Sequence, residues 1–363
     1  MNFLKLLTTL VPRKPPARLS LLLSAGALAL LSACGGGGGG GVEGNGAMTV
    51  VDATTMPVTP AVVVPVLVAS SYGAGSEELS AFNLLNYERD HCGFGLWAQN
   101  TQLDAAAKSH ADYQILNSVV SHTETMAAPG FTGRQPIDRI IAKSYTTTST
   151  ATGGVTDEIV AYTGTSSKTG LGANGIRGLL NAPYHLRGLM GTYRDIGLSV
   201  RSSADLGSST PSVYLQIDAA YKAAAGPQVV GSSDIKTYPC EGSTGINNKL
   251  SNESPNPVPG RDLATSPLGS VVYIAVKEGN ALTISSARMN QVSNGQAVTL
   301  RPPITSSNDP YRSCLEGCFR TNEAYLAADA PLQVSTAYQV SVSGSNNTTT
   351  FTRTFTFTTG NGS

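Results

Sequence analysis

The sequence has few charged residues and no excess of either sign. Lys and Arg together number 24, Asp and Glu also number 24, and charged residues make up 13% of the 363. Because no polybasic patch is present, the composition argues against nucleic acid as a partner.

Common signatures of nucleophilic catalysis and nucleotide binding are also missing. No Gly-x-Ser-x-Gly elbow occurs. The glycine pattern Gly170-x-Gly172-x-x-Gly175 follows a polar loop, whereas dinucleotide binding requires a strand before it. Ser121 and His122 are adjacent, and adjacent side chains of an extended segment point to opposite faces, so they do not form a dyad by sequence alone.

No apolar segment at the N-terminus is long enough to span a membrane. The run over residues 19–33 follows basic residues and ends in small ones, whereas a spanning helix needs about 20 apolar residues. This order is typical of a secretory signal peptide. Leu31-Ser32-Ala33-Cys34 resembles the lipobox of bacterial lipoproteins, which implies cleavage before Cys34 and lipidation of its thiol. An ordinary secreted protein is the alternative.

The lipid anchor predicts location and partners. Acyl chains contribute about 0.8 kcal/mol per buried CH₂, so two or three hold a protein on a membrane. Gly35 follows Cys34 in place of the aspartate associated with inner-membrane retention, which favours the outer membrane. We therefore expect a cell-envelope protein that contacts the membrane through its N-terminal lipid.

Four further cysteines remain for an oxidising compartment, so we expect two disulfides. Three connectivities are possible, and we favour Cys92–Cys240 with Cys314–Cys318. A metal site at Cys314-x-x-x-Cys318 would lack a second pair of ligands nearby.

Composition divides the chain into segments. The glycine run 35–41 and the proline-containing stretch to about residue 71 specify no packed core. The proline-rich residues 255–260 mark the clearest later boundary. The predicted segments are a signal peptide (1–33), a lipidated cysteine with its tether (34–75), a first domain (76–225), a disulfide-bearing linker (226–260) and a β-sandwich (261–363).

Residues 76–225 mix helical and strand patterns. Apolar residues recur on one helical face from Leu79 to Leu85 and again from Leu103 to Ala111, and shorter helices are expected after Pro136 and before Pro183. Strand-like runs occupy residues 158–162, 196–200 and 212–217. The mixture predicts one α+β domain with helices packed on a sheet.

Residues 261–363 show the period of two that half-buried strands have. The alternation covers residues 272–276 and 338–342, and phenylalanines share one face of the strand around residues 351–357. Residues 344–347 tolerate positive φ and predict a hairpin between the last two strands. About 100 residues of this kind predict an immunoglobulin-like sandwich.

Four histidines are present. His91 follows a helical pattern and is expected to be solvated or to cap the helix. His110 lies on an apolar helical face and is expected in the core with one nitrogen satisfied. His122 and His185 stand in polar settings and are the functional candidates.

The first domain contains a set of motifs at residues 103–116, 121–124, 156–161, and 181–187 followed by 193–198. In order and spacing these motifs resemble the CAP superfamily of cysteine-rich secretory proteins, antigen 5 and pathogenesis-related proteins, in its bacterial form.

The resemblance implies an α-β-α sandwich with a cleft lined by two histidines and two acidic residues. By position, His122 and His185 correspond to the histidines and Glu158 to the first acid. The second acid has no match, since Arg177 is the charged residue of the preceding helix. Glu124, two residues after His122, could supply that charge.

Some members of the family bind a divalent metal such as zinc through the histidines. His122, His185 and Glu158 could form a three-ligand zinc site with water in the fourth position. That water would be acidified and could attack a carbonyl or phosphate group. A hydrogen-bonded polar cluster that binds nothing is the alternative.

Three functions follow. The leading hypothesis is a non-enzymatic lipoprotein whose cleft binds a lipid, a metal or an envelope component, with the β-domain as a spacer or adhesion module. CAP proteins are credited with sterol or lipid binding, although fold alone does not fix function. The first alternative is a metal-dependent, protease-like hydrolase with Glu124 or Glu158 as catalytic base. The second is a structural or adhesive surface protein.

Overall fold

The computed structural model describes residues 61–311 and 319–362. The predicted signal peptide, Cys34, most of the tether, Cys314 and Cys318 lie outside these residues. The described residues belong to one compact unit. Within them, no helix is both long and apolar enough to cross a bilayer.

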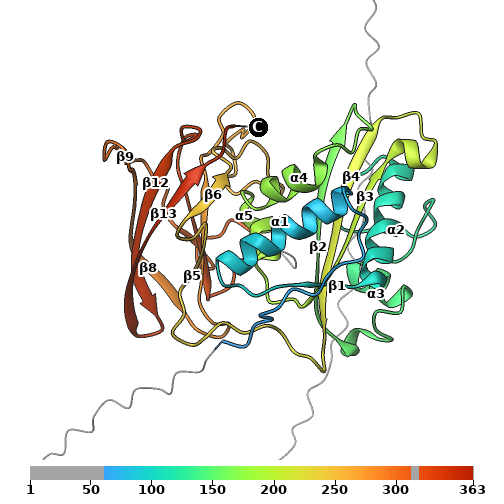
Figure 1. Cartoon of the computed structure of the whole chain (residues 1–363), viewed down its shortest axis with the longest axis horizontal. Coiled ribbons are helices and arrows are strands. Elements are labelled where there is room, and N and C mark those ends of the chain that lie inside the picture. Colours follow the sequence, from blue (N-terminus) through green and yellow to red (C-terminus); the bar gives the residue numbers. More distant parts are fainter. Residues whose placement is uncertain (1–60, 312–318, 363) are drawn as a thin grey trace, which may run out of the picture. The chain divides into compact units, whose positions relative to one another are not determined.

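The first half of the fold is a four-stranded sheet between two layers of helices (Figure 1). The strand order is β1-β3-β4-β2, so β2 lies at an edge. Helices α2 and α3 cover one face, and α1, α4 and α5 cover the other. The elements are α1 (Glu77–His91), β1 (Ala98–Gln99), α2 (Thr101–Asn117), α3 (Pro136–Ala142), η1 (Ser149–Ala151), β2 (Thr152–Thr163), α4 (Leu171–Leu179), α5 (Pro183–Leu189), β3 (Asp195–Ser202), η2 (Ser203–Leu206) and β4 (Ser212–Lys222).

Local signals explain where these helices begin. The Ser76 side chain accepts a hydrogen bond from the Leu79 amide and caps α1, and Asn100 caps α2 in the same way. Pro136 and Pro183 occupy the first positions of α3 and α5, where a missing amide costs nothing. The apolar face predicted for α2 is buried along its length. The predicted helices and strands of the first domain are therefore present.

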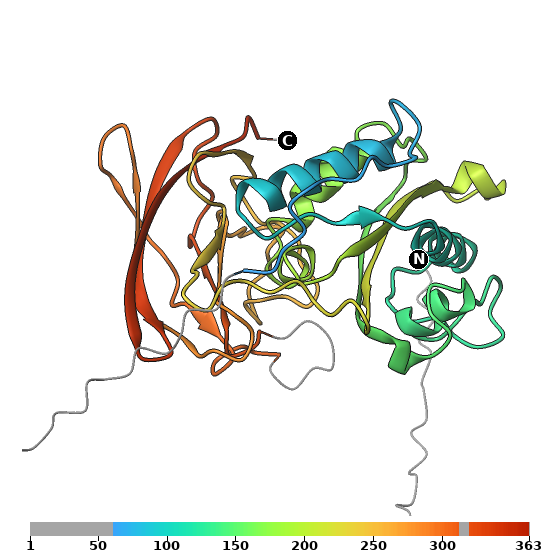
Figure 2. The ribbon, with the colours of Figure 1, turned by 60° about the horizontal axis from the view of Figure 1, so that its bottom comes forward.

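The second half contains two further sheets, with strand orders β10-β11-β7-β5 and β6-β13-β12-β8-β9. Helix α5 packs against β7, and one continuous apolar core includes residues of both halves. Figure 2 shows the ribbons of the two halves side by side. The strands are β5 (Lys236–Tyr238), β6 (Ser243–Ile246), β7 (Val271–Ala275), β8 (Leu282–Gln291), β9 (Ala297–Val298), β10 (Ile304–Thr305), β11 (Glu323–Ala327), β12 (Ala337–Asn346) and β13 (Thr349–Thr359).

Of two strand predictions for the C-terminal part, one is confirmed and one is wrong. Strands β12 and β13 form the predicted hairpin, which turns at Asn347 with φ of 54°. The prediction of a half-buried strand at residues 272–276 was wrong, because every residue of β7 is buried. This strand lies between β11 and β5 in its sheet and also faces α5, so neither of its faces reaches solvent.

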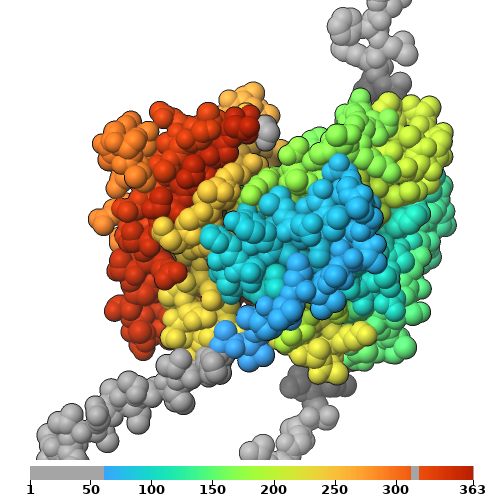
Figure 3. All heavy atoms as spheres, in the orientation of Figure 1, coloured from blue at the N-terminus to red at the C-terminus, as the bar shows by residue number. Residues whose placement is uncertain are grey.

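Segments predicted as tether and linker take part in the fold. Val62 pairs with Val229, and the Leu96 amide donates to the Val64 carbonyl. Figure 3 shows these N-terminal residues lying across the surface beside α1. Strands β5 and β6 come from residues 226–260, and each is an edge strand of a different C-terminal sheet.

The predicted Cys92–Cys240 disulfide is confirmed, and it joins the end of α1 to the segment between β5 and β6. The α+β class is also confirmed. The immunoglobulin-like type of the C-terminal sheets stays a prediction.

Candidate functional site

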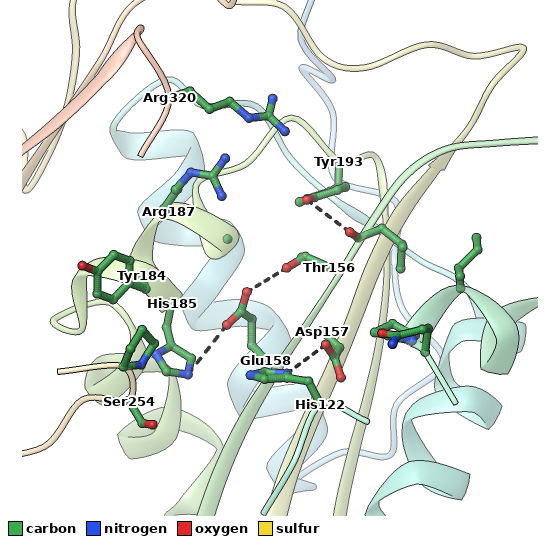
Figure 4. A pocket seen from close by; sticks show the side chains of 16 residues that line it. His122, Thr156, Asp157, Glu158, Tyr184, His185, Arg187, Tyr193, Ser254 and Arg320 are labelled. Carbon is green, nitrogen blue, oxygen red and sulfur yellow. Dashed lines mark hydrogen bonds and ion pairs between the residues drawn. The ribbon is translucent and has the colours of Figure 1, made fainter. Parts of the chain in front are cut away.

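A cavity of about 580 Å³ opens at the β2 edge of the first sheet (Figure 4). Its walls come from the start of α3, from β2, from α5 and from three positions of the C-terminal half, Ser254, Pro255 and Arg320. His122, Glu158 and His185 all line it, as predicted from the sequence. Glu124 does not line it.

Adjacent residues of β2 serve the two faces of the sheet. Asp157 contacts Arg139 on the α3 side, whereas Glu158 lies near His185 on the α5 side. Successive strand residues point to opposite faces. Because β2 is an edge strand, both carboxylates still line the same cavity.

His122 is held by a buried carboxylate. Its Nδ1 lies 2.9 Å from Asp157 Oδ1, and Arg139 Nη2 donates to Asp157 Oδ2 at 2.8 Å. Arg139 also donates to the His122 carbonyl at 3.1 Å. Burial alone would lower the pKa of His122, but the hydrogen bond and charge of Asp157 outweigh it and raise that pKa.

His185 is held in the same way by a residue from the second half of the chain. Its Nδ1 lies 2.9 Å from Oε1 of Glu253, whose side chain is fully buried. Burial opposes the charged imidazole, but the charge and hydrogen bond of Glu253 prevail and raise the pKa of His185 to about 9. The two imidazole rings have centroids 6.5 Å apart.

Glu158 lies on the cavity wall between the histidines. Thr156 donates to its Oε1 at 2.9 Å, and His185 Nε2 is 3.9 Å from its Oε2. Burial raises the pKa of Glu158 to about 7, against the opposing charges of His185 and His122. A Cβ at position 188 would overlap Glu158 Oε1, so only glycine there leaves room for the carboxylate.

Glu124 is buried and does not line the cavity, and its carboxylate is bound by a core histidine and by backbone amides. One oxygen pairs with His110 Nδ1 at 2.9 Å, and the amides of Thr132 and Gly133 donate to the other. His110 Nε2 in turn bonds the Ser121 carbonyl, so both nitrogens of this core histidine are satisfied, not one as predicted. The buried Glu124 therefore does not supply the second acid or the base that was predicted for the cleft.

Asp157 and Glu253, the carboxylates that bind His122 and His185, were not predicted as site residues. Asp157 precedes Glu158 in the stretch 156–161 that carries the family resemblance, so a pair of acids was visible in the sequence. Glu253 is 68 residues from His185 in a segment predicted as linker, and no sequence pattern indicates the contact.

Helix α5, which carries His185, is fixed by several contacts to the second half. Tyr184 donates to Asp309 Oδ1 at 2.8 Å, and Arg187 Nε donates to Glu323 Oε2 at 2.6 Å. At the start of the helix, Asn181 bonds the Lys249 carbonyl and the Val271 amide. The C-terminal sheets thus determine where His185 stands.

The zinc site predicted from His122, Glu158 and His185 stays a prediction. Among the described residues, no three His, Cys, Asp or Glu side chains are grouped so that they could hold a metal ion. Glu158 Oε2 and His185 Nε2 are 3.9 Å apart, and Thr156 donates to Glu158 Oε1. Carboxylates that hold the far side of a histidine, as Asp157 and Glu253 do here, also occur in the outer shells of metal sites.

No family model matches the chain, and no curated protein matches its sequence significantly. Solved structures that are similar in part include the following two. An outer surface protein of Borrelia burgdorferi has 15% identity and a TM-score of 0.31, over 43% of this chain and 99% of that one. An extracellular SCP-domain protein of Bacillus anthracis has 18% identity and a TM-score of 0.31, over 40% of each chain.

Proposed function

We propose that this chain is an exported lipoprotein of the CAP type, anchored through Cys34, whose cleft binds a small polar ligand between His122, Glu158 and His185. One observation carries the proposal: two histidines from opposite faces of a sheet line one cavity, each held by a buried carboxylate, with Glu158 between them. A cavity of this size suits a small-molecule ligand.

The cleft presents hydrogen-bond donors that are already oriented. Nδ1 of each ring is committed to Asp157 or Glu253, which leaves Nε2 for the cleft. The pKa of His185, raised to about 9, keeps its imidazole protonated at neutral pH, and Asp157 raises the pKa of His122 and so favours its charged form. The pKa of Glu158, about 7, lets that carboxyl donate or accept. Such a site can bind a ligand without rearranging its own side chains.

Ligand binding is favoured over catalysis by what surrounds the histidines. Among the described lining residues, neither Thr156 nor Ser254 is hydrogen-bonded to an imidazole, and Thr156 donates to Glu158 instead. An activated nucleophile needs a base within hydrogen-bond reach. With Glu124 committed to His110, the hydrolase hypothesis keeps Glu158 as its one remaining candidate base.

The proposal is tested on full-length protein extracted in mild detergent from its own envelope. Wild type is compared with the His122→Asn/His185→Asn variant and with His91→Asn, a change on α1 outside the cavity. We expect a small molecule to co-purify with wild type and His91→Asn and to fall about tenfold in the double variant, as loss of two charge-assisted donors implies. Mass spectrometry measures it.

The same samples separate the alternatives. Intact mass shows whether the mature chain begins at an acylated Cys34. Metal analysis should find no stoichiometric zinc, and zinc that disappears in the double variant would favour the hydrolase. An envelope protein retained equally by all three samples would favour adhesion through another surface. Equal small-molecule content in all three would contradict ligand binding at the histidines.

A further inference from the structure

Guanidinium groups line the end of the cleft away from the histidines. Arg187 from α5 and Arg320 from the segment before β11 both line it, and in Figure 4 both extend toward the side where Tyr193 lies. The two arginines come from different halves of the chain. Neither was singled out by the sequence.

The carboxylates that neutralise these arginines lie behind them. Arg187 Nε donates to Glu323, and Arg320 pairs with Glu278, yet neither glutamate lines the cleft. Glu323 is further occupied by the Tyr273 hydroxyl and the Arg320 amide. Among the described residues, no hydrogen bond is made by the two terminal nitrogens of Arg187. The terminal nitrogens of Arg187 therefore remain as donors for a ligand in the cleft.

A second cavity continues from this end. It measures about 310 Å³, and Arg187, Gly188, Tyr193 and Arg320 line both cavities. Glu278 and Glu323 line the second cavity. The arginines thus stand at the boundary, with the cleft on one side and their own counter-ions toward the other.

We propose that Arg187 and Arg320 form an anion subsite, which binds a carboxylate or phosphate group of the ligand whose other end meets His122 and His185. The planar guanidinium matches both anions in a bidentate way, and charge-assisted hydrogen bonds of this kind are about twice as strong as neutral ones. The subsite rests on the proposed function, because it assigns a chemical class to the same ligand. It also makes the second half of the chain part of the binding site.

The test titrates the purified full-length protein in detergent with inorganic phosphate and, separately, with acetate. Binding is followed by ¹H–¹⁵N signals of the arginine Nε groups. Arg320→Gln removes one cation whose side chain is 55% exposed, so folding should be unaffected. Arg353→Gln on β13 is a matched control, since Arg353 is exposed and lies outside both cavities. Arg320→Lys keeps the positive charge but loses the planar guanidinium group that can donate two parallel hydrogen bonds.

We expect Arg320→Gln to weaken binding of the preferred anion about tenfold, Arg320→Lys to weaken it less, and Arg353→Gln to change it less than about twofold. Whichever anion binds more tightly identifies the group on the ligand. An unchanged affinity in Arg320→Gln, equal weakening in Arg353→Gln, or no binding of either anion at millimolar concentration would overturn the subsite.

A comparison of the double histidine variant with Arg320→Gln separates this result from the proposed function. If His122→Asn/His185→Asn loses the co-purified ligand while Arg320→Gln keeps both ligand and anion affinity, the histidine site stands and the anion subsite fails. If Arg320→Gln loses anion affinity and the double histidine variant keeps its co-purified ligand, the subsite stands and the proposed role of the histidines fails.

Discussion

Replacing Cys92 and Cys240 together by alanine is expected to lower the free energy of unfolding by about 5 kcal/mol. The bond joins residues 148 apart in sequence, and closing a loop of that length removes about this much chain entropy from the unfolded state. Total stabilities are about 5–15 kcal/mol, so the loss would be a large share. Urea unfolding of the oxidised wild type and of the variant measures it.

Reducing conditions supply the control. With a thiol reductant present, wild type and the double variant should unfold at the same urea concentration, because the cross-link is then absent from both. A difference of less than about 1 kcal/mol between the oxidised proteins would contradict the chain-entropy argument. The bond also secures the segment that leads to Glu253, so the variant should lose cleft binding before it loses helical structure.

Replacing Glu158 by glutamine is expected to remove a pH dependence of stability of about 3 kcal/mol between pH 4.5 and 7.5. Burial raises the pKa of Glu158 to about 7 from its ordinary value of 4.5. Between these values the folded state holds a proton that the unfolded state has released. The free energy of unfolding therefore falls as pH rises through this window, and glutamine, which does not titrate, removes the part of the fall that Glu158 contributes.

Other groups must be separated from this effect. Asp218 is buried beside Asp157, and its raised pKa acts in the same direction. The raised pKa of His185 contributes stability that is present below about pH 6.5 and lost as pH rises through about 9. Both contributions persist in Glu158→Gln, so the variant should keep a weaker slope. Urea unfolding at several pH values measures it, with the exposed Glu278→Gln as control. If the free energy of unfolding of Glu158→Gln changed with pH as steeply as that of wild type, the raised pKa of Glu158 would be contradicted.

Much of the site could be predicted because its residues lie in local patterns. His122, Glu158 and His185 stand in short polar motifs beside recognisable helices and strands, and they line one cavity. Glu124 was misassigned because closeness in sequence to His122 does not fix direction. The chain after α2 turns its side chain toward the core, where His110 and backbone amides bind it.

The contacts between the two halves could not be predicted. Glu253 lies in a proline-rich segment without periodicity, and its contact with His185 depends on how the C-terminal sheets pack on α5. Arg320 reaches the cleft for the same reason. The sequence suggested a spacer or adhesion module, whereas the contacts of this module make it a wall of the cleft.

The most direct test of this shared cleft is the protonation state of His185 in wild type and in Glu253→Gln. The chain has only four histidines, so their imidazole ¹H–¹⁵N signals can be assigned one by one. With the pKa of His185 raised to about 9 by Glu253, the ring should remain charged at pH 8 in wild type and become neutral in the variant, while His91 and His110 stay unchanged. A His185 ring that is neutral at pH 8 in both proteins would contradict the account.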